Sequence, residues 1–268
     1  MICFPNCKIN LGLNIEGKRT DGFHNINTMM YPVSLCDALE ITTSSETRMS
    51  LSGFPITGPI EDNLVYRAYC LLKKRFQLPL VRIHLHKAVP AQSGLGGGSS
   101  DAAFMLNMLN DLFELKLVKE ELQDLSLEMG SDCPFFITNR PANSSGRGEI
   151  LEETDLNIND YFICIVKPDV YISTSEAYRN IPINPCTRKI ADITKMPVEK
   201  WKNYLTNDFE DFAFKRYPVI KDIKESLYKE GAIYASMSGS GSAVYGIFSS
   251  NPGLKSNYKD MFYYEGIL

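Results

Sequence analysis

A glycine-rich stretch at residues 90–103, PAQSGLGGGSSDAA, has the composition of an anion-binding loop. Glycines occupy four of the five positions from Gly94 to Gly98, and two serines and an aspartate follow. Backbone N–H groups in such a loop can reach a ligand because no side chains stand in the way. A helix that begins directly after the loop adds the partial positive charge of its N-terminus. These residue types in this order indicate a binding site for phosphate groups.

The stretch differs from the two commonest phosphate-binding motifs. GxxxxGK[ST] requires a lysine after the glycines, and none follows Gly98; GxGxxG requires a further glycine where the sequence has Ser99. The alternative interpretation is a flexible linker, but linkers are not normally bracketed this closely by apolar segments. We therefore interpret residues 90–103 as a phosphate-binding loop of another type.

The segments on either side of the loop predict the elements that position it. Apolar and polar residues alternate over 81–86, which predicts a strand. Residues 102–113 are densely apolar and contain neither Gly nor Pro, which predicts a buried helix. Ser99 or Ser100 is the expected N-cap, with Asp101 in the first turn. The expected order is strand, loop and helix N-terminus.

Three other places carry residues suited to chemistry. Residues 9–15 alternate as an amphipathic strand, which places Lys8 and Asn10 together on the face opposite the aliphatic side chains. Asp132 lies between a helix expected at 118–129, with Gly130 as its C-cap, and an aromatic strand expected from Phe135. An aspartate in such a place is an N-cap or turn residue more often than a catalytic one.

A second small-residue loop, SGSGS at 238–242, suggests that both halves of the chain contribute backbone to one cleft.

The remaining elements follow from periodicity and from Gly and Pro. We expect a turn at 17–24, strand from 26 to 41 with breaks near Pro32 and Asp37, loops or hairpins over 43–60, and a helix at 63–76. Further on we expect a strand at 161–167, a loop from 168 leading into a helix capped by Ser173 or Thr174, and an irregular segment at 180–201. Helices at 207–217 and 219–230, split at Pro218, and a strand at 244–248 complete the chain. A change of composition at 154–160 predicts two domains, 1–155 and 156–268.

Composition limits the possible functions. The chain has 268 residues, 44% hydrophobic and 22% charged, and a net charge of −4, which predicts a globular protein and argues against a nucleic-acid partner. No signal peptide and no apolar run long enough for a membrane span occur in the sequence, so we expect a cytoplasmic protein without a membrane partner. Seven scattered cysteines without CxxC, beside only three histidines, predict reduced thiols and no zinc site.

Together these residues can supply the parts of a kinase site. Phosphoryl transfer needs backbone donors for a polyphosphate, a cation near the transferred group and often a carboxylate that takes the proton of the acceptor hydroxyl. The glycine loop, Lys8, Asp132 and the 238–242 loop provide them. They do not identify the acceptor.

The three segments KINL at 8–11, the glycine loop and MSGSGS at 237–242 resemble the motif pattern of the GHMP kinase superfamily. Six more segments are similar to the branch whose acceptor is a cytidine-diphosphate-linked methylerythritol: GKRTDGFH at 17–24, NLV at 63–65, GSDCPFF at 130–136, GRGEIL at 146–151, STSEAY at 173–178 and NDFE at 207–210. The matches run in the expected order across nearly the whole chain.

The resemblance implies a two-domain α/β fold of two-layer α+β type. Its N-terminal domain is like the second domain of ribosomal protein S5, its C-terminal domain is ferredoxin-like, and the active site lies in the cleft between them. The implied reaction moves the γ-phosphoryl of ATP, with Mg²⁺ bound to the ATP, onto the 2-hydroxyl of the acceptor in the non-mevalonate route to isoprenoid precursors. The implied partners are these small molecules, and the chain is a monomer or a weak homodimer.

The resemblance also assigns roles to residues. Asp132 accepts the proton of the hydroxyl, and Lys8 stabilises the charge that develops. The residues assigned to ATP are Asn63, Pro90, Ala91, Gln92, Ser93, Gly94, Leu95, Gly96, Gly97, Gly98, Ser99, Ser100, Ser238, Gly239 and Ser240. The residues assigned to the acceptor are Asn10, Phe23, His24, Thr174 and Tyr178.

Three positions depart from the family pattern. Gln92 and Ser93 stand where small residues are usual, Phe23 stands where tyrosine is common, and Cys133 stands where a small aliphatic residue is common and is interpreted as packing only. Arg147, in the GRGE turn, is either a solvated loop residue or a neighbour of the phosphates, and the first interpretation is favoured. Two alternatives stay open: a related kinase acting on a sugar, homoserine or mevalonate, and a nucleotide-sensing module without catalysis.

Overall fold

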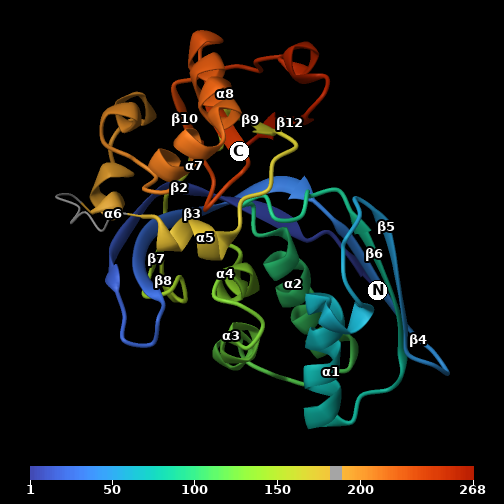
Figure 1. The fold of residues 1–268 in the computed structure, drawn as a ribbon. Coiled ribbons are helices and arrows are strands. Elements are labelled where there is room, and N and C mark those ends of the chain that lie inside the picture. Colours follow the sequence, from blue (N-terminus) through green and yellow to red (C-terminus); the bar gives the residue numbers. More distant parts are fainter. Residues whose placement is uncertain (182–188) are drawn as a thin grey trace. The chain divides into compact units, whose positions relative to one another are not determined.

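The computed structural model describes residues 1–181 and 189–268, and its helices and strands are labelled in Figure 1. The chain forms two compact units. Unit 1 contains Met1–Cys7, Leu35–Ala91 and Gly96–Arg140, and unit 2 contains Lys8–Ser34, Gln92–Leu95 and Pro141–Leu268. These units are defined by contacts and interleave along the chain. The family domains 1–155 and 156–268 remain a prediction.

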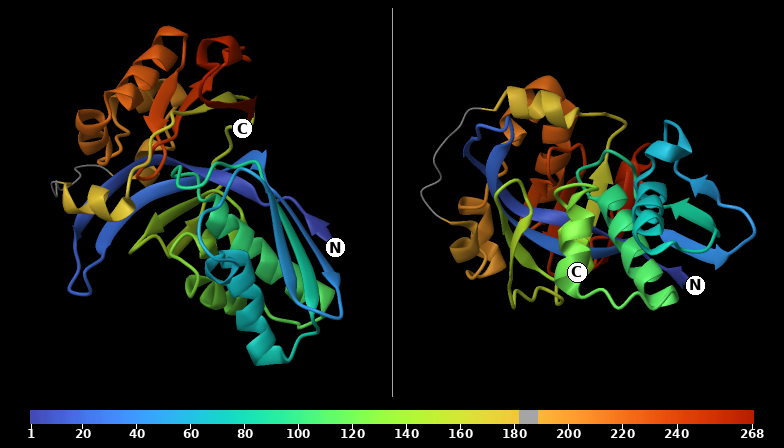
Figure 2. Two further views of the ribbon diagram at one scale, coloured as in Figure 1. Left: turned by 45° about the vertical axis from the view of Figure 1, so that its right-hand side comes forward. Right: turned by 90° about the horizontal axis from the view of Figure 1, so that it is seen from below.

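Unit 1 is a sheet with helices on one face. The strands run in the order β1 (Ile2–Cys3), β4 (Ala38–Thr43), β6 (Val81–Lys87) and β5 (Arg48–Gly53), with β5 parallel to β6 and the other pairs antiparallel. Helices α1 (Leu64–Phe76) and α2 (Gly97–Leu112) lie on the same face of this sheet (Figures 1 and 2). The unit also contains η1 (Ile60–Asp62), α3 (Lys119–Leu127) and α4 (Cys133–Thr138).

The alternation over 81–87 explains the packing of this layer. Val81, Ile83 and Leu85 are fully buried, whereas Arg82 and His86 are exposed, as the period of two requires. Apolar side chains of α1 and α2 complete the core against them. The predicted strand, loop and helix around the glycines are confirmed.

Unit 2 contains two sheets. The first has the order β2 (Asn6–Lys18), β3 (His24–Cys36), β7 (Ala142–Ser145) and β8 (Ile150–Glu153), and the first residues of β2 and the last of β3 belong to unit 1. The second has the order β10 (Tyr234–Met237), β11 (Val244–Phe248), β9 (Phe162–Lys167) and β12 (Phe262–Ile267), all antiparallel. Both sheets contribute apolar side chains to one core.

The helices of unit 2 follow the second half of the chain. They are α5 (Thr174–Arg179), α6 (Ile190–Ile193), η2 (Val198–Asn203), α7 (Glu210–Arg216), α8 (Pro218–Lys229) and η3 (Lys255–Tyr258). Helix α8 packs on β10 and β11 (Figure 1), and Pro218 occupies its first turn, where a missing N–H costs nothing. The predicted break between α7 and α8 is therefore confirmed.

Several element predictions were wrong. The aromatic segment after Asp132 is helix α4 and not a strand, because Pro134 suits a first helical turn and two adjacent buried phenylalanines fit a short helix as well as a strand. Strand β3 continues through Pro32, which lies beyond the residues paired with β7, Thr28–Met30. The segment 43–60, expected to form hairpins or loops, contains the strand β5, which pairs in parallel with β6 and so forms no hairpin with it. The segment expected to be irregular includes α6 and η2.

The start of α2 also differs from expectation. The N-cap is Gly96, in the left-handed region with φ of 73°, and no side chain caps the helix. Ser99 and Ser100 lie within the first turn, and Asp101 lies one residue beyond it. The glycines therefore form the helix N-terminus itself, which brings the first backbone N–H groups directly into the loop.

The cysteines agree with the expectation of reduced thiols. Cys7, Cys133 and Cys164 are buried, Cys3 and Cys36 are half-buried, Cys70 is exposed, and these six form no disulfide with one another; Cys186 lies outside the described residues. Burial, the largest cause, raises the pKa of Cys133 to about 12. This thiol is therefore neutral near pH 7 and acts as a packing group beside Asp132.

Candidate functional site

Strand β2 places Lys8 and Asn10 side by side in unit 2. Their exposed fractions are only 3% and 2%, so neither is a solvated residue of a strand face. Lys8 Nζ donates to Asn10 Oδ1 at 2.5 Å, and Asn10 Nδ2 donates to Thr28 Oγ1 at 3.0 Å. The predicted placement of Lys8 and Asn10 on one face of the strand is confirmed, and both side chains are fixed by hydrogen bonds.

The two small-residue loops meet in unit 2, although more than a hundred residues separate them in sequence. Ser238 Oγ donates to the carbonyl of Gly94 at 2.9 Å, and the N–H of Ala243 donates to the carbonyl of Ser93 at 3.0 Å. The N–H of Lys8 donates to the carbonyl of Leu95 at 2.9 Å. Backbone from residues 92–95 and 238–243 therefore lies together beside the strand that carries Lys8.

Gly94 is the position where this approach is closest. A Cβ added there would lie 1.9 Å from the carbonyl oxygen of Ser238, and its φ of +80° is in the left-handed region. We expect Gly94→Ala to lower the free energy of unfolding by about 2–5 kcal/mol, because left-handed backbone costs about 1–2 and overpacking about 1–3 kcal/mol. Urea unfolding measures the difference.

Gly98→Ala is the matched control from the same loop. Its nearest neighbour would be a Leu64 methyl at 3.8 Å, and Gly98 lies inside α2. Its stability is expected to stay equal or to rise, because alanine favours a helix over glycine by up to about 1 kcal/mol. Equal stabilities of the two variants would contradict the close approach at Gly94.

The backbone conformation at Gln92 shows how the loop accommodates one departure from the family pattern. Its φ of 52° lies in the left-handed region, which favours glycine, and its side chain is exposed. The loop therefore keeps the backbone conformation that suits a small residue, while glutamine occupies the position.

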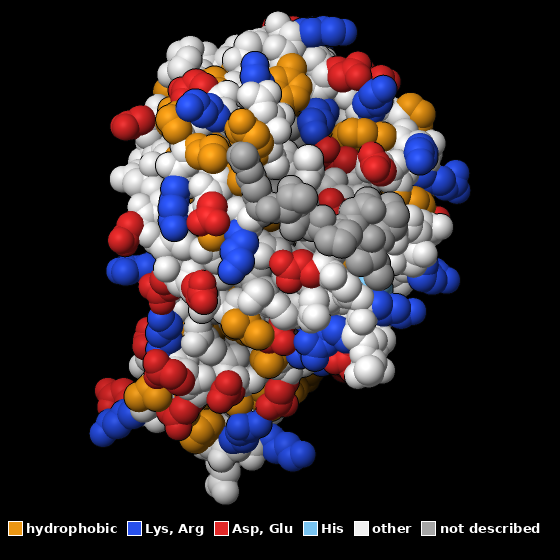
Figure 3. Space-filling model, turned by 90° about the vertical axis from the view of Figure 1, so that its left-hand side faces the viewer, with side chains coloured by type: hydrophobic (Ala, Val, Ile, Leu, Met, Phe, Trp, Pro, Cys, Tyr) orange, Lys and Arg blue, Asp and Glu red, His pale blue; other side chains and the backbone are white. Residues whose placement is uncertain are grey.

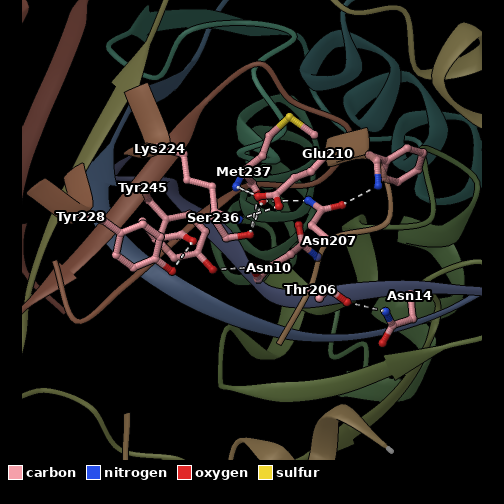
Figure 4. Close-up of polar contacts among 12 residues, drawn as sticks. Asn10, Asn14, Thr206, Asn207, Glu210, Lys224, Tyr228, Ser236, Met237 and Tyr245 are labelled. Carbon is pink, nitrogen blue, oxygen red and sulfur yellow. Dashed lines mark hydrogen bonds and ion pairs between the residues drawn. The ribbon is translucent and has the colours of Figure 1, made fainter. Parts of the chain in front are cut away.

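The side chains of Asn207 and Glu210 form hydrogen bonds with the backbone at the start of the second loop (Figure 4). Asn207 Nδ2 donates to the carbonyls of Met237 and Gly239, both at 2.8 Å. Glu210 Oε1 accepts from the N–H of Met237 at 2.9 Å, and Lys224 Nζ donates to its other oxygen at 2.6 Å. The NDFE segment resembles the family, but its residues carry no expected role. Asn207 and Glu210 stand three residues apart, and both side chains lie beside the loop.

Two of the residues predicted to bind the acceptor, His24 and Tyr178, contact each other. The rings of His24 and Tyr178 stack with centroids 5.0 Å apart and an interplanar angle of 21°, and Tyr178 meets Phe209 edge-on at 4.9 Å. Burial first, and the charge of Lys18 second, lower the pKa of His24. A neutral imidazole is therefore favoured at pH 7, and it presents one hydrogen-bond donor and one acceptor.

Thr174 links the acceptor residues to the second loop. Its Oγ1 lies 3.2 Å from Ser240 Oγ, within hydrogen-bond distance. Ser173, and not Thr174, is the N-cap of α5, although its side chain makes no capping bond. Thr174 is exposed, so its hydroxyl is accessible to a ligand.

Phe23 lies at the turn between β2 and β3 and is 50% exposed. The guanidinium of Arg147 lies over its ring, 4.8 Å from the centroid. Arg147 also approaches Glu149 at 3.5 Å. Arg147 is therefore not the solvated loop residue that its context suggested; it packs on a ring predicted to contact the acceptor.

Unit 1 holds the other candidate residues. Asp132 is the N-cap residue of α4, is half-buried and makes no side-chain capping bond to that helix. Asn63 Oδ1 accepts from the N–H of Val65 at 2.9 Å and so caps α1, a structural role that the sequence analysis did not separate from ATP binding. Ser100 is fully buried, and its Oγ has no hydrogen-bond partner among the described residues.

A cavity of about 820 Å³ in unit 2 involves other residues. It is lined mainly by residues 152–158 and 194–198, with Tyr161 and Trp201. None of the candidate catalytic, ATP or acceptor residues lines it. The cavity is therefore lined by residues other than the candidate catalytic, ATP and acceptor residues.

The described residues show neither a surface of one charge sign, on the face drawn in Figure 3, nor a cluster of metal ligands. Lysine and arginine side chains are interspersed with aspartate and glutamate over the described part of the face in Figure 3. In residues 1–181 and 189–268, no group of three His, Cys, Asp or Glu side chains is placed to hold a metal ion. No helix of these ranges combines the length and the apolar character needed to cross a membrane.

Comparisons with known families agree with the geometry. Residues 63–140 match the GHMP kinases N terminal domain, and residues 191–257 match the GHMP kinases C terminal domain. Among solved structures, a 4-(cytidine 5'-diphospho)-2C-methyl-D-erythritol kinase is similar at a TM-score of 0.84 and 29% identity, covering 99% of this chain and 98% of that one. A homoserine kinase from Cytophaga hutchinsonii, at 14% identity and a TM-score of 0.68 over 100% and 94% of the two chains, shares the fold. The predicted two-domain α/β fold is thereby confirmed.

Curated relatives are more similar still. A protein of Parabacteroides distasonis is 49% identical over 100% of both chains, and one of Bacteroides thetaiotaomicron is 52% identical over 92% of both. Both are named 4-diphosphocytidyl-2-C-methyl-D-erythritol kinase. At this identity over this length, the chain belongs to the family of 4-diphosphocytidyl-2-C-methyl-D-erythritol kinases, within the GHMP kinases.

Proposed function

We propose that this chain transfers the γ-phosphoryl group of ATP to the 2-hydroxyl of 4-(cytidine 5'-diphospho)-2-C-methyl-D-erythritol, which gives the 2-phosphate and ADP. The observation that carries the proposal is the full-length identity of 49% to a relative of that name. The packing of both small-residue loops beside Lys8 supports it from the structure. The reaction belongs to the non-mevalonate route to isoprenoid precursors, and we place it in the cytoplasm.

The roles proposed for the side chains follow from their chemistry. Asp132 accepts the proton of the 2-hydroxyl as the oxygen attacks phosphorus. Lys8 stabilises the negative charge of the transferred phosphoryl group, and Asn10 fixes the position of its Nζ. The N–H groups at the start of α2 bind the phosphates of ATP, because the first amides of a helix have no acceptor within it. Most of the rate then comes from positioning.

The residues of the cytidine pocket are proposed from the ring contacts. His24, stacked on Tyr178, offers hydrogen bonds to cytosine, and Phe23 offers an exposed ring face for stacking. Because phenylalanine lacks a hydroxyl, position 23 contributes stacking and no hydrogen bond. Thr174 contributes a hydroxyl at the edge of the second loop.

Mg²⁺ is proposed as the metal of the reaction, carried in on ATP. Hydroxyl oxygen is a ligand type that Mg²⁺ accepts, and the unpartnered Oγ of Ser100 at the start of α2 fits such a role. The metal neutralises charge on the phosphates when it is bound. We propose a monomer or a weak homodimer with no nucleic-acid or membrane partner.

We expect Arg147 to fix the ring of Phe23 in the position in which it stacks on the cytosine. Arg147→Met should raise KM for the cytidine substrate by about twofold to fivefold, which corresponds to the loss of a cation–π contact of about 0.5–1 kcal/mol. The kcat and the KM for ATP should not change, and steady-state kinetics measures all three. Arg140→Met, at an exposed position, is the control. An unchanged KM for the cytidine substrate would show that Arg147 does not support binding.

The function is tested by the choice of acceptor. Purified protein with ATP and Mg²⁺ is given the cytidine substrate, homoserine, mevalonate or a hexose, and ADP formation is followed. The proposal expects ADP only with the cytidine substrate. Faster turnover of another acceptor would make the chain a different GHMP kinase, and ADP formation that no acceptor increases would remove the kinase function.

A further inference from the structure

Three ionisable side chains are buried together in unit 1: Asp37, Lys87 and Asp101. Their side chains are 0%, 3% and 3% exposed. Lys87 Nζ donates to Asp37 Oδ2 and, at 2.6 Å, to Asp101 Oδ2. None of the three was assigned to ATP, to the acceptor or to catalysis. They are called the Asp37–Lys87–Asp101 cluster below.

The cluster joins three separate segments of the chain around the glycine loop. Asp37 lies between β3 and β4, Lys87 ends β6, and Asp101 is the fifth residue of α2. Asp37 Oδ1 also accepts the N–H of Ala88 at 2.6 Å and that of Val89 at 2.8 Å. These two residues lead from β6 directly into the loop, so Asp37 fixes the point where the chain enters it.

The same cluster fixes the point where the chain leaves the loop. Asp101 accepts from Lys87, which attaches the beginning of α2 to the end of β6. A Cβ added to Gly97 would lie 3.3 Å from Lys87 Nζ and 3.0 Å from a Val89 methyl, so the first residue of the helix packs directly on the lysine. Both ends of the glycine loop are therefore held by one ammonium group and its two carboxylates.

A contribution to stability does not by itself explain why these three charged side chains are buried together. Removing charges from water costs several kcal/mol per ion, and buried ion pairs often stabilise a fold no more than apolar residues do. Burial, the largest cause, raises the pKa of Asp101 to about 7, even though Lys87 opposes the rise. Asp101 Oδ1 has no hydrogen-bond partner among the described residues. The cluster thus keeps an incompletely satisfied carboxylate at the point where loop and helix meet.

We propose that the Asp37–Lys87–Asp101 cluster is a positioning device for ATP. By fixing the entry and the exit of the loop relative to each other, it holds the first N–H groups of α2 where the phosphates bind, before ATP arrives. Binding then requires less ordering of the backbone. The inference rests on the proposed function, because it assigns the loop to ATP.

The test compares Asp101→Ala with Asp101→Asn. Alanine removes the acceptor for Lys87, whereas the Oδ1 of asparagine keeps both the acceptor and the side-chain volume. We expect Asp101→Ala to raise the KM for ATP, and the Kd of a non-hydrolysable ATP analogue measured by calorimetry, by about tenfold or more, because a small misplacement of binding groups is costly. The KM for the cytidine substrate should change by less than about twofold, and Asp101→Asn should restore both ATP constants to within about threefold of the unsubstituted chain.

Leu109→Ala is the matched control for destabilisation. Leu109 is fully buried on the same helix, far from the loop in sequence, and its truncation lowers stability without touching the cluster. Its ATP constants should stay unchanged. If Leu109→Ala weakens ATP binding as much as Asp101→Ala, or if Asp101→Ala leaves the Kd of the analogue within about twofold, the positioning role is wrong.

If Asp101→Ala does not fold, Asp101→Ser, which shortens the side chain but keeps a polar group, is judged by the same constants. If the unsubstituted chain binds the ATP analogue but does not turn over the cytidine substrate, the proposed acceptor is wrong. The analogue Kd values of the variants still decide the role of the cluster.

Discussion

Asp132→Asn is expected to lower kcat by about 10²–10⁴-fold, the range that a positioned general base contributes. Asparagine has the shape of aspartate but cannot accept the proton of the 2-hydroxyl. Asp132 makes no capping bond to α4, so the substitution should leave that helix in place. Steady-state ADP formation with saturating ATP and cytidine substrate gives kcat, and thermal unfolding shows whether the fold is kept.

Asp124→Asn serves as the control, because Asp124 is an exposed carboxylate on the neighbouring helix α3. It should turn over at the rate of the unsubstituted chain. If Asp132→Asn is folded and keeps more than about a third of that rate, Asp132 is not the base, and a water molecule or the substrate phosphates must take the proton.

Lys8→Met is expected to have the second largest effect, a fall in kcat of about 10²–10³-fold, which is typical when one preorganised donor to a developing charge is removed. Methionine fills nearly the same volume but carries no charge. Asn10 Oδ1 would lose its donor inside the protein, which costs about 1–3 kcal/mol of stability. The kcat, the KM for ATP and the free energy of unfolding are measured together.

Lys229→Met, at the exposed end of α8 in the same unit, is the control and should match the unsubstituted chain in all three quantities. A stability loss without a fall in kcat would give Lys8 a purely structural role. A rise in the KM for ATP at constant kcat would make it a ground-state binding residue instead of one that acts in the transition state.

The pattern of residue types within short segments was enough to predict the strands and helices that carry the candidate site residues. Alternation of apolar and polar residues predicted β2 and β6, an apolar run predicted β9, and the glycines between β6 and α2 predicted a loop at a helix N-terminus. Pro218 predicted the division between α7 and α8. In each case the signal lies within a few residues, where periodicity and backbone preferences act.

The errors arose where a local signal fits two structures. Phe135 and Phe136 suit a buried strand or a buried helix, and in the structure both are buried residues of α4. Ser99 and Ser100 are good N-cap residues, but a glycine in left-handed conformation begins α2 earlier and places both serines inside it. Pro32 disrupts a strand only where its missing N–H is needed.

The contacts that support the site have no local signal at all. Lys87 and Asp37 lie 50 residues apart, and Asn207 lies 32 residues from the carbonyl of Gly239 that it binds. Arg147 reaches the ring of Phe23 from a different turn. Periodicity describes which face of one element is buried, and it does not say which residue of another element meets it.

The position of the new phosphate on the product tests the central claim most directly. Carbon 2 of the methylerythritol carries a methyl group, a hydroxyl and two carbons, and no hydrogen. The reaction of ATP, the cytidine substrate and this chain should therefore give a new phosphate monoester whose ³¹P signal, without proton decoupling, is a singlet. A doublet or triplet would place the phosphate on a carbon that carries hydrogen, and no new monoester signal would mean that the cytidine compound is not the acceptor; either result would contradict the proposed function.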